Sequence, residues 1–219
     1  MAKQKGVYGS HYTGQLGKAV VGSTWKDQKV LRTYSVPTNP NTAGQQAQRA
    51  KFKLSQVVAS NILQLVIWPY WNPFANSQSG FNAFIGYNSQ VVTGNDDFIN
   101  IRSVVGSYEG VAQITTATYN ATNGDVDISW PTAPVSIGDS LDREIALCLD
   151  FTEYDPDDKT PIVLAYLKDD MTRGDGFEQF NIRSGLTPSD IFVYLGMRQP
   201  ATDSVLKIGT SVSKQCVAL

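Results

Sequence analysis

The sequence predicts a mainly β protein with a small α-helical module, and three observations support this fold class. Charged residues make up only 17% of the 219 residues, which is low for a protein built on surface helices. The chain contains 18 Gly and 10 Pro, residues that are typical of turns. Its second half consists of short β-favouring runs between turn sequences. We therefore expect an extended arm over residues 1–40, a helical module over 41–94 and an antiparallel β-sandwich over 95–219.

The first forty residues are predicted to form a basic, Gly-rich arm that contains one hairpin. Glycine recurs too often here for a helix, at Gly6, Gly9, Gly14, Gly17 and Gly22. The runs 19–22 and 29–34 favour β structure and would form the hairpin. The arm has too few apolar residues to bury a core of its own. Trp25 and Tyr34 therefore need a surface to pack on, either the body of the same chain or a neighbouring copy.

The helical module is predicted from periodicity and capping. A turn at residues 39–42 precedes a helix from Ala43, with Gln45 in the capping-box position after Thr42. The apolar positions of this helix follow a 3.6-residue period and include Ala47, Ala50, Leu54, Val57, Val58 and Ile62. A second helix is expected from Ser79 to about residue 93.

Between the two helices, Pro69 and Pro73 bracket an aromatic segment. We interpret this segment as a helix start or a tight turn rather than a helix interior, because proline disrupts the helical hydrogen-bond ladder. The aromatic residues of the module are expected to form its core rather than a ligand cage: Trp68, Trp71, Phe74, Phe81 and Phe84.

The remaining residues read as strands separated by turns. Within 125–130 the apolar residues Val126, Ile128 and Trp130 alternate with polar ones, as a half-buried strand requires. Strands are predicted over residues 98–105, 111–119, 125–130, 144–152, 161–167, 177–183, 191–196 and 205–217. Seven or eight strands in this length suit a sandwich of immunoglobulin-like size.

Candidate catalytic and metal-binding residues are few. His11 is the only histidine and lies on the Gly-rich arm, where nothing resembles a nucleophile elbow. Cys148 and Cys216 lack metal-site spacing and are expected to be buried free thiols. The acidic group 150–158 lacks the glycine and closing glutamate of an EF-hand, so a solvated loop is favoured. We therefore expect no enzyme activity, no cofactor and no metal. No apolar run reaches the length of a membrane span.

Charge is distributed unevenly. Residues 1–60 carry nine Lys and Arg against Asp27 alone, a net +8, so the rest of the chain sums to −10. Such a basic segment suits docking on an acidic partner surface, with nucleic acid as the lesser alternative. The docking residues are predicted to be Trp25 as an apolar anchor and Arg32 as a charged contact, supported by Lys26, Lys29 and Tyr34. Binding of cell-surface glycans or host proteins by the loops between strands is a further alternative.

Several motifs occur in a fixed order along residues 6–105. They are Gly14 to Lys26, Arg32, the Asn39-Pro-Asn-Thr turn with Gln45 and Arg49, and Ser79-Gly-Phe-Asn. In this order they resemble an uncharacterised family of proteins of similar length from Bacteroidota bacteria and phages. The resemblance implies a component of a phage virion, made in the bacterial cytoplasm, whose partners are copies of itself and other virion proteins. It supplies no catalytic residues.

Overall fold

The computed structural model describes residues 2–3, 14–16, 19–26, 28–36, 38–94, 96–106, 112–133, 142–155, 164–198 and 209–219. The chain divides into two compact units, Met1–Thr42 and Ala43–Leu219. Each unit is described by itself below. No described helix is both long and apolar enough to cross a membrane.

The N-terminal unit is a four-stranded antiparallel sheet. Its strands β1 (Ala2–Lys3), β2 (Gly14–Leu16), β3 (Val20–Trp25) and β4 (Gln28–Thr33) lie in the order β1-β4-β3-β2. The predicted hairpin is present as β3 and β4, paired from Val20↔Thr33 to Trp25↔Gln28. The structure adds a strand on each side of it, because the flanking backbone groups find partners in the two hairpin strands. The unit is thus a small sheet rather than an extended arm.

The helical part begins with α1 (Ala43–Asn61) and ends with α2 (Gly80–Val91), which confirms both predicted helices. The Ser79 hydroxyl caps α2 by accepting a hydrogen bond from the Asn82 amide at 3.2 Å. The segment between them differs from the prediction. Leu63–Trp71 forms a π-helix, η2, with Pro69 inside it, followed by a 3₁₀ turn at Asn72–Phe74. A π turn is wider than an α turn, which moves the proline ring away from the carbonyl that it would otherwise contact.

The rest of the second unit is a sandwich of two four-stranded sheets. The sheet that we call inner has the order β11-β10-β7-β8, and the one that we call outer has the order β12-β5-β6-β9. Their strands are β5 (Thr116–Asn120), β6 (Asp125–Ser129), β7 (Arg143–Asp150), β8 (Leu164–Lys168), β9 (Phe177–Asn181), β10 (Ile191–Arg198), β11 (Val212–Gln215) and β12 (Val217–Ala218). Neighbouring strands are antiparallel except for β12 and β5.

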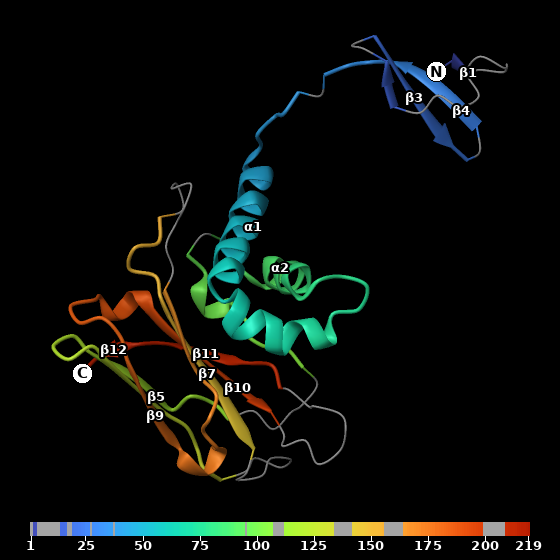
Figure 1. Cartoon of the computed structure of the whole chain (residues 1–219). Helices are drawn as coiled ribbons and strands as arrows, with labels where there is room; N and C mark the ends of the chain where they lie inside the picture. Colours follow the sequence, from blue (N-terminus) through green and yellow to red (C-terminus); the bar gives the residue numbers. More distant parts are fainter. Residues whose placement is uncertain are drawn as a thin grey trace. The chain divides into compact units, whose positions relative to one another are not determined.

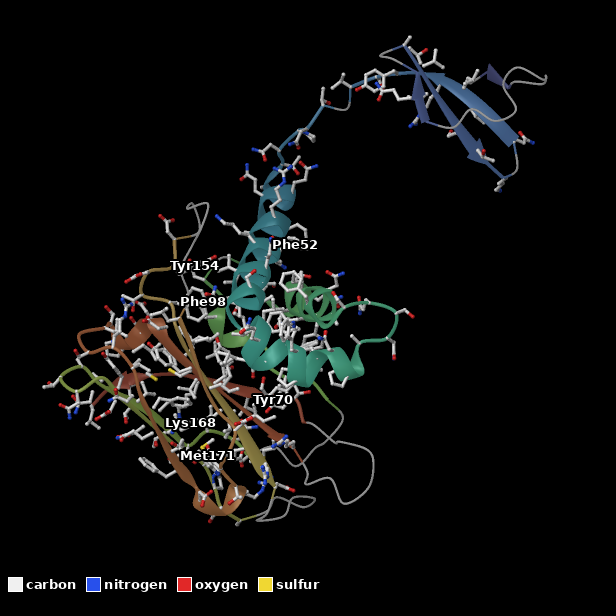
Figure 2. The ribbon with its side chains drawn as sticks, viewed as in Figure 1. Phe52, Tyr70, Phe98, Tyr154, Lys168 and Met171 are labelled. Carbon is white, nitrogen blue, oxygen red and sulfur yellow. The ribbon has the colours of Figure 1, made fainter. Side chains whose placement is uncertain are left out.

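The predicted strand over residues 98–105 is wrong. Phe98–Asn100 is a short 3₁₀ helix, and residues 101–106 run without a strand partner. Side chains instead satisfy the backbone: the Arg102 amide donates to Asn88 Oδ1 at 2.8 Å and the Ser103 amide donates to Ser211 Oγ at 2.9 Å. Phe98 stacks on Phe151 with ring centroids 4.0 Å apart, and Tyr154 packs edge-on against Phe98 (Figure 2).

The inner sheet is covered on both faces, which joins the helices and the sandwich into one unit. Along β7, Ile145, Leu147 and Leu149 belong to the core shared with α1, η2 and α2. Ala146 and Cys148 alternate with them and belong to the core between the two sheets. Figure 1 shows the helices on the side of β7 and β10 that faces away from β5 and β9. The predicted boundary at residue 94 is therefore not a boundary between compact units.

Candidate docking surface and other candidate sites

Two of the predicted docking residues lie together in the N-terminal unit. Arg32 and Tyr34 line a cavity of about 240 Å³ together with Val21, Thr33 and Ser35. The register places Val21 directly opposite Arg32. Arg32 is exposed, and Tyr34 is held in place because its amide donates to the Ala19 carbonyl at 2.9 Å. A guanidinium beside a phenol and two hydroxyl side chains suits a carboxylate or another anion.

The other predicted docking residues lie at one end of the hairpin. Lys26 occupies its turn with a left-handed φ of 47° and is exposed. Trp25 ends β3 and pairs with Gln28, while Lys29 pairs with Thr24. The side chains of Trp25 and Lys29 lie outside the part of the chain that the structure describes.

The described side chains of the N-terminal sheet form almost no core. Among its described side chains only Val30 is a buried hydrophobic residue, at 8% exposure, while Val20, Val21 and Leu31 are half-buried. A sheet of this size needs a covered apolar face to be stable. The described part of this unit therefore shows no second layer over the sheet.

A cluster of buried charges lies in the sandwich and was not predicted from the sequence. Asp142, Glu144 and Arg173 are fully buried, and Arg173 pairs with Asp142 at 3.5 Å. Arg173 also contacts the Met197 sulfur. Burial raises the pKa of Glu144 to about 8, with Asp142 adding to the shift and Arg173 opposing it. The charged pair Arg143-Glu144 directly before an apolar strand was the only sequence signal for this cluster.

The acidic group over residues 150–158 is only partly a solvated loop. Asp150 ends β7, is buried, and binds Arg183 at 3.0 Å, and Glu153 binds the same guanidinium at 2.6 Å. Arg183 follows β9, so this cluster fixes the inner sheet to the outer one. Asp155 is exposed, and Asp157 and Asp158 lie outside the described residues. Within the described ranges, no three His, Cys, Asp or Glu side chains gather as a metal site.

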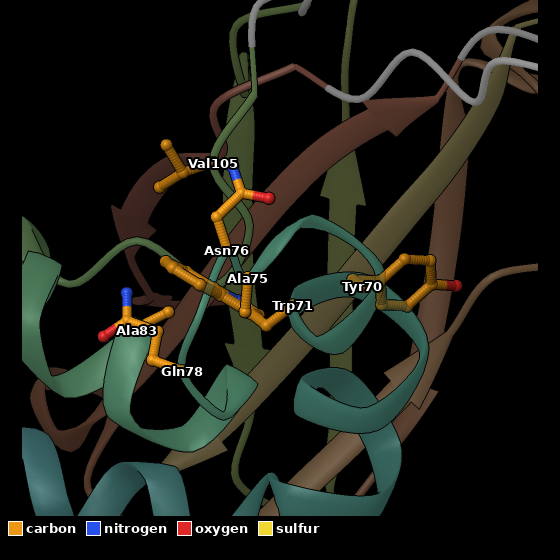
Figure 3. A pocket seen from close by; sticks show the side chains of 7 residues that line it. All are labelled: Tyr70, Trp71, Ala75, Asn76, Gln78, Ala83 and Val105. Atoms are coloured by element: carbon orange, nitrogen blue, oxygen red, sulfur yellow. The ribbon is translucent and has the colours of Figure 1, made fainter.

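The aromatic segment forms core, as predicted for Trp71 and Phe84, whose rings meet edge-on at 5.2 Å. Trp68 differs, because its side chain is 55% exposed. The side chain of Phe74 lies outside the described part. Beside Trp71 there is a pocket of about 310 Å³, lined also by Tyr70, Ala75, Asn76, Gln78, Ala83 and Val105 (Figure 3).

The two aromatic walls of this pocket are fixed in place. The Trp71 indole donates to the Ser103 carbonyl at 2.7 Å, and the Tyr70 hydroxyl donates to Asp169 at 3.0 Å. The pKa of Tyr70 is raised to about 12, mainly by burial and in addition by Asp169. This hydroxyl therefore stays protonated at neutral pH. The side chains of Tyr70 and Trp71 are therefore held in place, and no residue that lines the pocket is charged.

Comparison with known proteins adds one finding. A family model described as a family of unknown function, DUF6266, matches residues 11–212. No curated protein matches the sequence at a significant level.

Proposed function

We propose that this chain, which belongs to DUF6266, a family of unknown function, is a non-enzymatic structural component of a phage particle. The proposal rests on the physical features of the chain. Its N-terminal unit docks on neighbouring subunits, and its second unit forms the body. The proposal covers a capsid-, connector- or tail-associated role, with other copies of the chain and other virion proteins as partners.

One observation carries this proposal: the N-terminal sheet is basic, and its described side chains bury little apolar surface. Residues 1–42 carry six Lys and Arg against one Asp, and the described sheet buries only one hydrophobic side chain well. Sheets with an uncovered apolar face gain their stability from a packed second layer. A partner surface would supply that layer, and the positive charge would select an acidic partner.

The order of motifs over residues 6–105 supports the phage assignment. The hairpin β3–β4, helix α1 and the Ser79-capped helix α2 carry, in this order, the motifs by which the sequence resembles that family. In such an arrangement the first unit binds neighbouring subunits and the second unit forms the body of the subunit.

The proposal is tested by deleting residues 2–36. We expect the deletion variant to lose self-association in light scattering and to be absent from purified particles after expression in infected cells. Circular dichroism should show the second unit still folded, since α1 begins at Ala43, outside the deletion. A deletion variant that assembles and enters particles like the full chain would overturn the proposal. If the full chain binds nucleic acid in a salt-sensitive way and the deletion variant does not, the nucleic-acid alternative is favoured instead.

The pocket at the aromatic segment favours a second candidate function, the binding of a neutral sugar. It offers two aromatic walls and the carboxamides of Asn76 and Gln78, the chemistry that sugar hydroxyls and ring faces require. Residues 54–95 contain no charged residue at all, which suits an uncharged ligand. This site lies among the helices, whereas the sequence suggested the loops of the sandwich.

Titration with neutral mono- and oligosaccharides, followed by tryptophan fluorescence and calorimetry, tests this candidate. We expect Asn76→Ala and Gln78→Ala each to weaken binding about tenfold, as loss of a polar contact to a ligand does. Gln90→Ala removes an exposed amide on α2 outside the pocket and serves as the control. Equal binding by all three variants would exclude the pocket as the site.

A further inference from the structure

We propose that the exposed face of the outer sheet, formed by β12, β5, β6 and β9, receives the N-terminal sheet of a second copy of this chain. The inference rests on the proposed docking function and adds the surface on which docking occurs. Three independent features of the described residues carry it: the distribution of charge along the chain, the side chains of the exposed face, and the match with the N-terminal sheet.

Charge separates the chain into three zones. Residues 1–53 carry nine Lys and Arg and one Asp, a net +8, and residues 54–95 carry none. Residues 96–219 carry nine Lys and Arg against nineteen Asp and Glu, a net −10. The basic zone includes the whole N-terminal sheet, and the acidic zone includes the whole sandwich. Opposite charge favours contact between the two units and disfavours contact between two like units.

Within the acidic zone, the charged side chains on the strands of the outer sheet are all acidic. Its four strands contain Asp125, Asp127 and Glu178 but no Lys or Arg. Glu178 already pairs with Lys168 at 3.1 Å. Asp125 and Asp127 share the exposed face, because Val126 and Ile128, which alternate with them, are fully buried in the core.

The two carboxylates are held in position. Gln179 on β9 donates to Asp127 at 2.8 Å, and Asn181 donates to Asp125 at 2.9 Å. These amide donors are neutral, so the negative charge of both carboxylates remains for a partner. Each carboxylate also keeps an oxygen that these two hydrogen bonds do not use. The face therefore presents two pre-oriented acceptors for a cation.

Apolar side chains flank the carboxylates. Phe177 on the edge strand β9 is 52% exposed, and Val217 on the opposite edge strand β12 is 59% exposed. A partner that covers this face would bury both. Exposure of these apolar side chains to water is unfavourable. A second sheet that combines Arg with apolar residues would cover them and pair with the carboxylates.

The N-terminal sheet has that combination. The half-buried Val21 and the exposed Arg32 lie opposite each other on one of its faces, and Val30 on the same face is already buried. Arg32 lies beside Tyr34 in the cavity described above. Two sheet faces stack about 10 Å apart in proteins, close enough for Arg32 to reach a carboxylate of the facing sheet. The body of one copy would thus cover Arg32 and Val21 on the N-terminal sheet of another.

Such a contact joins two different surfaces of the same chain. Contacts of this kind propagate into a ring when the rotation closes and into a filament when it does not. Either product is a form that a particle component can use. The surface also predicts a dependence on ionic strength, because it relies on Arg–carboxylate pairs.

The experiment measures self-association by sedimentation equilibrium and light scattering over a range of protein concentrations. We expect the double variant Asp125→Asn/Asp127→Asn to lower the association constant at least about tenfold, with the amide–oxygen bonds to Gln179 and Asn181 retained. Asp170→Asn removes an exposed carboxylate outside this face and is the control. Arg32→Asp should weaken association similarly, and Arg32→Asp combined with Asp127→Arg should recover part of it.

The outcomes separate the surface from the docking function. If deletion of residues 2–36 abolishes association but the double variant associates like the wild type, the receiving surface is wrong and the docking function stands. If the deletion itself has no effect, both fail. If the full chain remains a monomer at every concentration, docking on a second copy is overturned. Circular dichroism and thermal melting confirm that each variant is folded before it is compared.

Discussion

At the scale of single residues, the buried cluster of Asp142, Glu144 and Arg173 ties the stability of the sandwich to pH. Glu144 points into the core between the sheets, and neither of its carboxylate oxygens has a hydrogen-bond partner among the described residues. Its pKa rises from 4.5 to about 8, mainly because burial disfavours the charged form. The folded state therefore binds a proton that the unfolded state releases above pH 4.5. This contribution to stability is complete below pH 4.5 and is lost as the pH rises to 8.

Glu144→Gln should remove this dependence. Glutamine has the shape of the protonated acid, so the variant and the wild type should be about equally stable at pH 5. At pH 9 we expect the variant to be more stable, by on the order of 3 kcal/mol in the free energy of unfolding. Urea denaturation at both pH values measures the difference. A wild type that is as stable as the variant at pH 9 would contradict the buried, protonated state of Glu144.

The sequence was informative about single residues where chemistry is local. The pattern of Lys and Arg among aromatic residues singled out Arg32 and Tyr34, which line one cavity, while their docking role stays a prediction. It could not predict that Trp68 is exposed while Trp71 is buried, since both sit in the same apolar run. That difference depends on the π-helical turn. The ion pair between Asp150 and Arg183 spans two sheets and has no local signal.

At the scale of elements, the hairpin between β5 and β6 depends on a glycine. Gly124 has a left-handed φ of 79°, and a Cβ atom there would collide with the Ile182 carbonyl. Gly86 on α2 is the opposite case, because a Cβ atom there meets nothing within 4 Å. The two positions make a matched pair for the same substitution.

Gly124→Ala should destabilise the protein by about 1–3 kcal/mol through backbone strain and the collision. Gly86→Ala should stabilise it by about 0.5–1 kcal/mol, because alanine favours the helix. Thermal melting shows whether each variant melts below or above the wild type. A stabilising effect at Gly124 would show that the turn has another conformation.

The spacing of apolar residues predicted the type of an element where that element has a regular hydrogen-bond ladder. Both α-helices and the strands β5 to β10 lie within their predicted segments or extend at most two residues beyond them, although β5 begins five residues after the predicted start. The failures occur where tertiary contacts replace the regular backbone ladder. Residues 101–106 look like a strand, but Asn88 and Ser211 take over their amides. Pro69 indicated a turn, yet the wider π-helix accommodates it.

At the scale of the whole molecule, the two units should differ in local stability. Strands β7 and β10 are buried on both faces, whereas the N-terminal sheet has only one well-buried hydrophobic residue among its described side chains. Amides open more readily where few apolar contacts hold the backbone.

Hydrogen exchange should therefore be fast in residues 20–33 at low protein concentration and slow in β7 and β10 at every concentration. At concentrations where the chain self-associates, we expect protection of residues 20–33 to increase at least about tenfold. Mass spectrometry of peptic fragments reads both regions in one experiment. Protection of the N-terminal sheet that is strong and independent of concentration would mean that it needs no partner.

The double covering of the inner sheet makes the sandwich inseparable from the helices. A fragment that began at residue 95 would bare Ile145, Leu147, Leu149, Phe192 and Tyr194, the side chains that the helices cover. It would expose a wide apolar sheet surface to water and would aggregate. Attempts to isolate the β part for ligand screening should therefore retain everything from Ala43 onward.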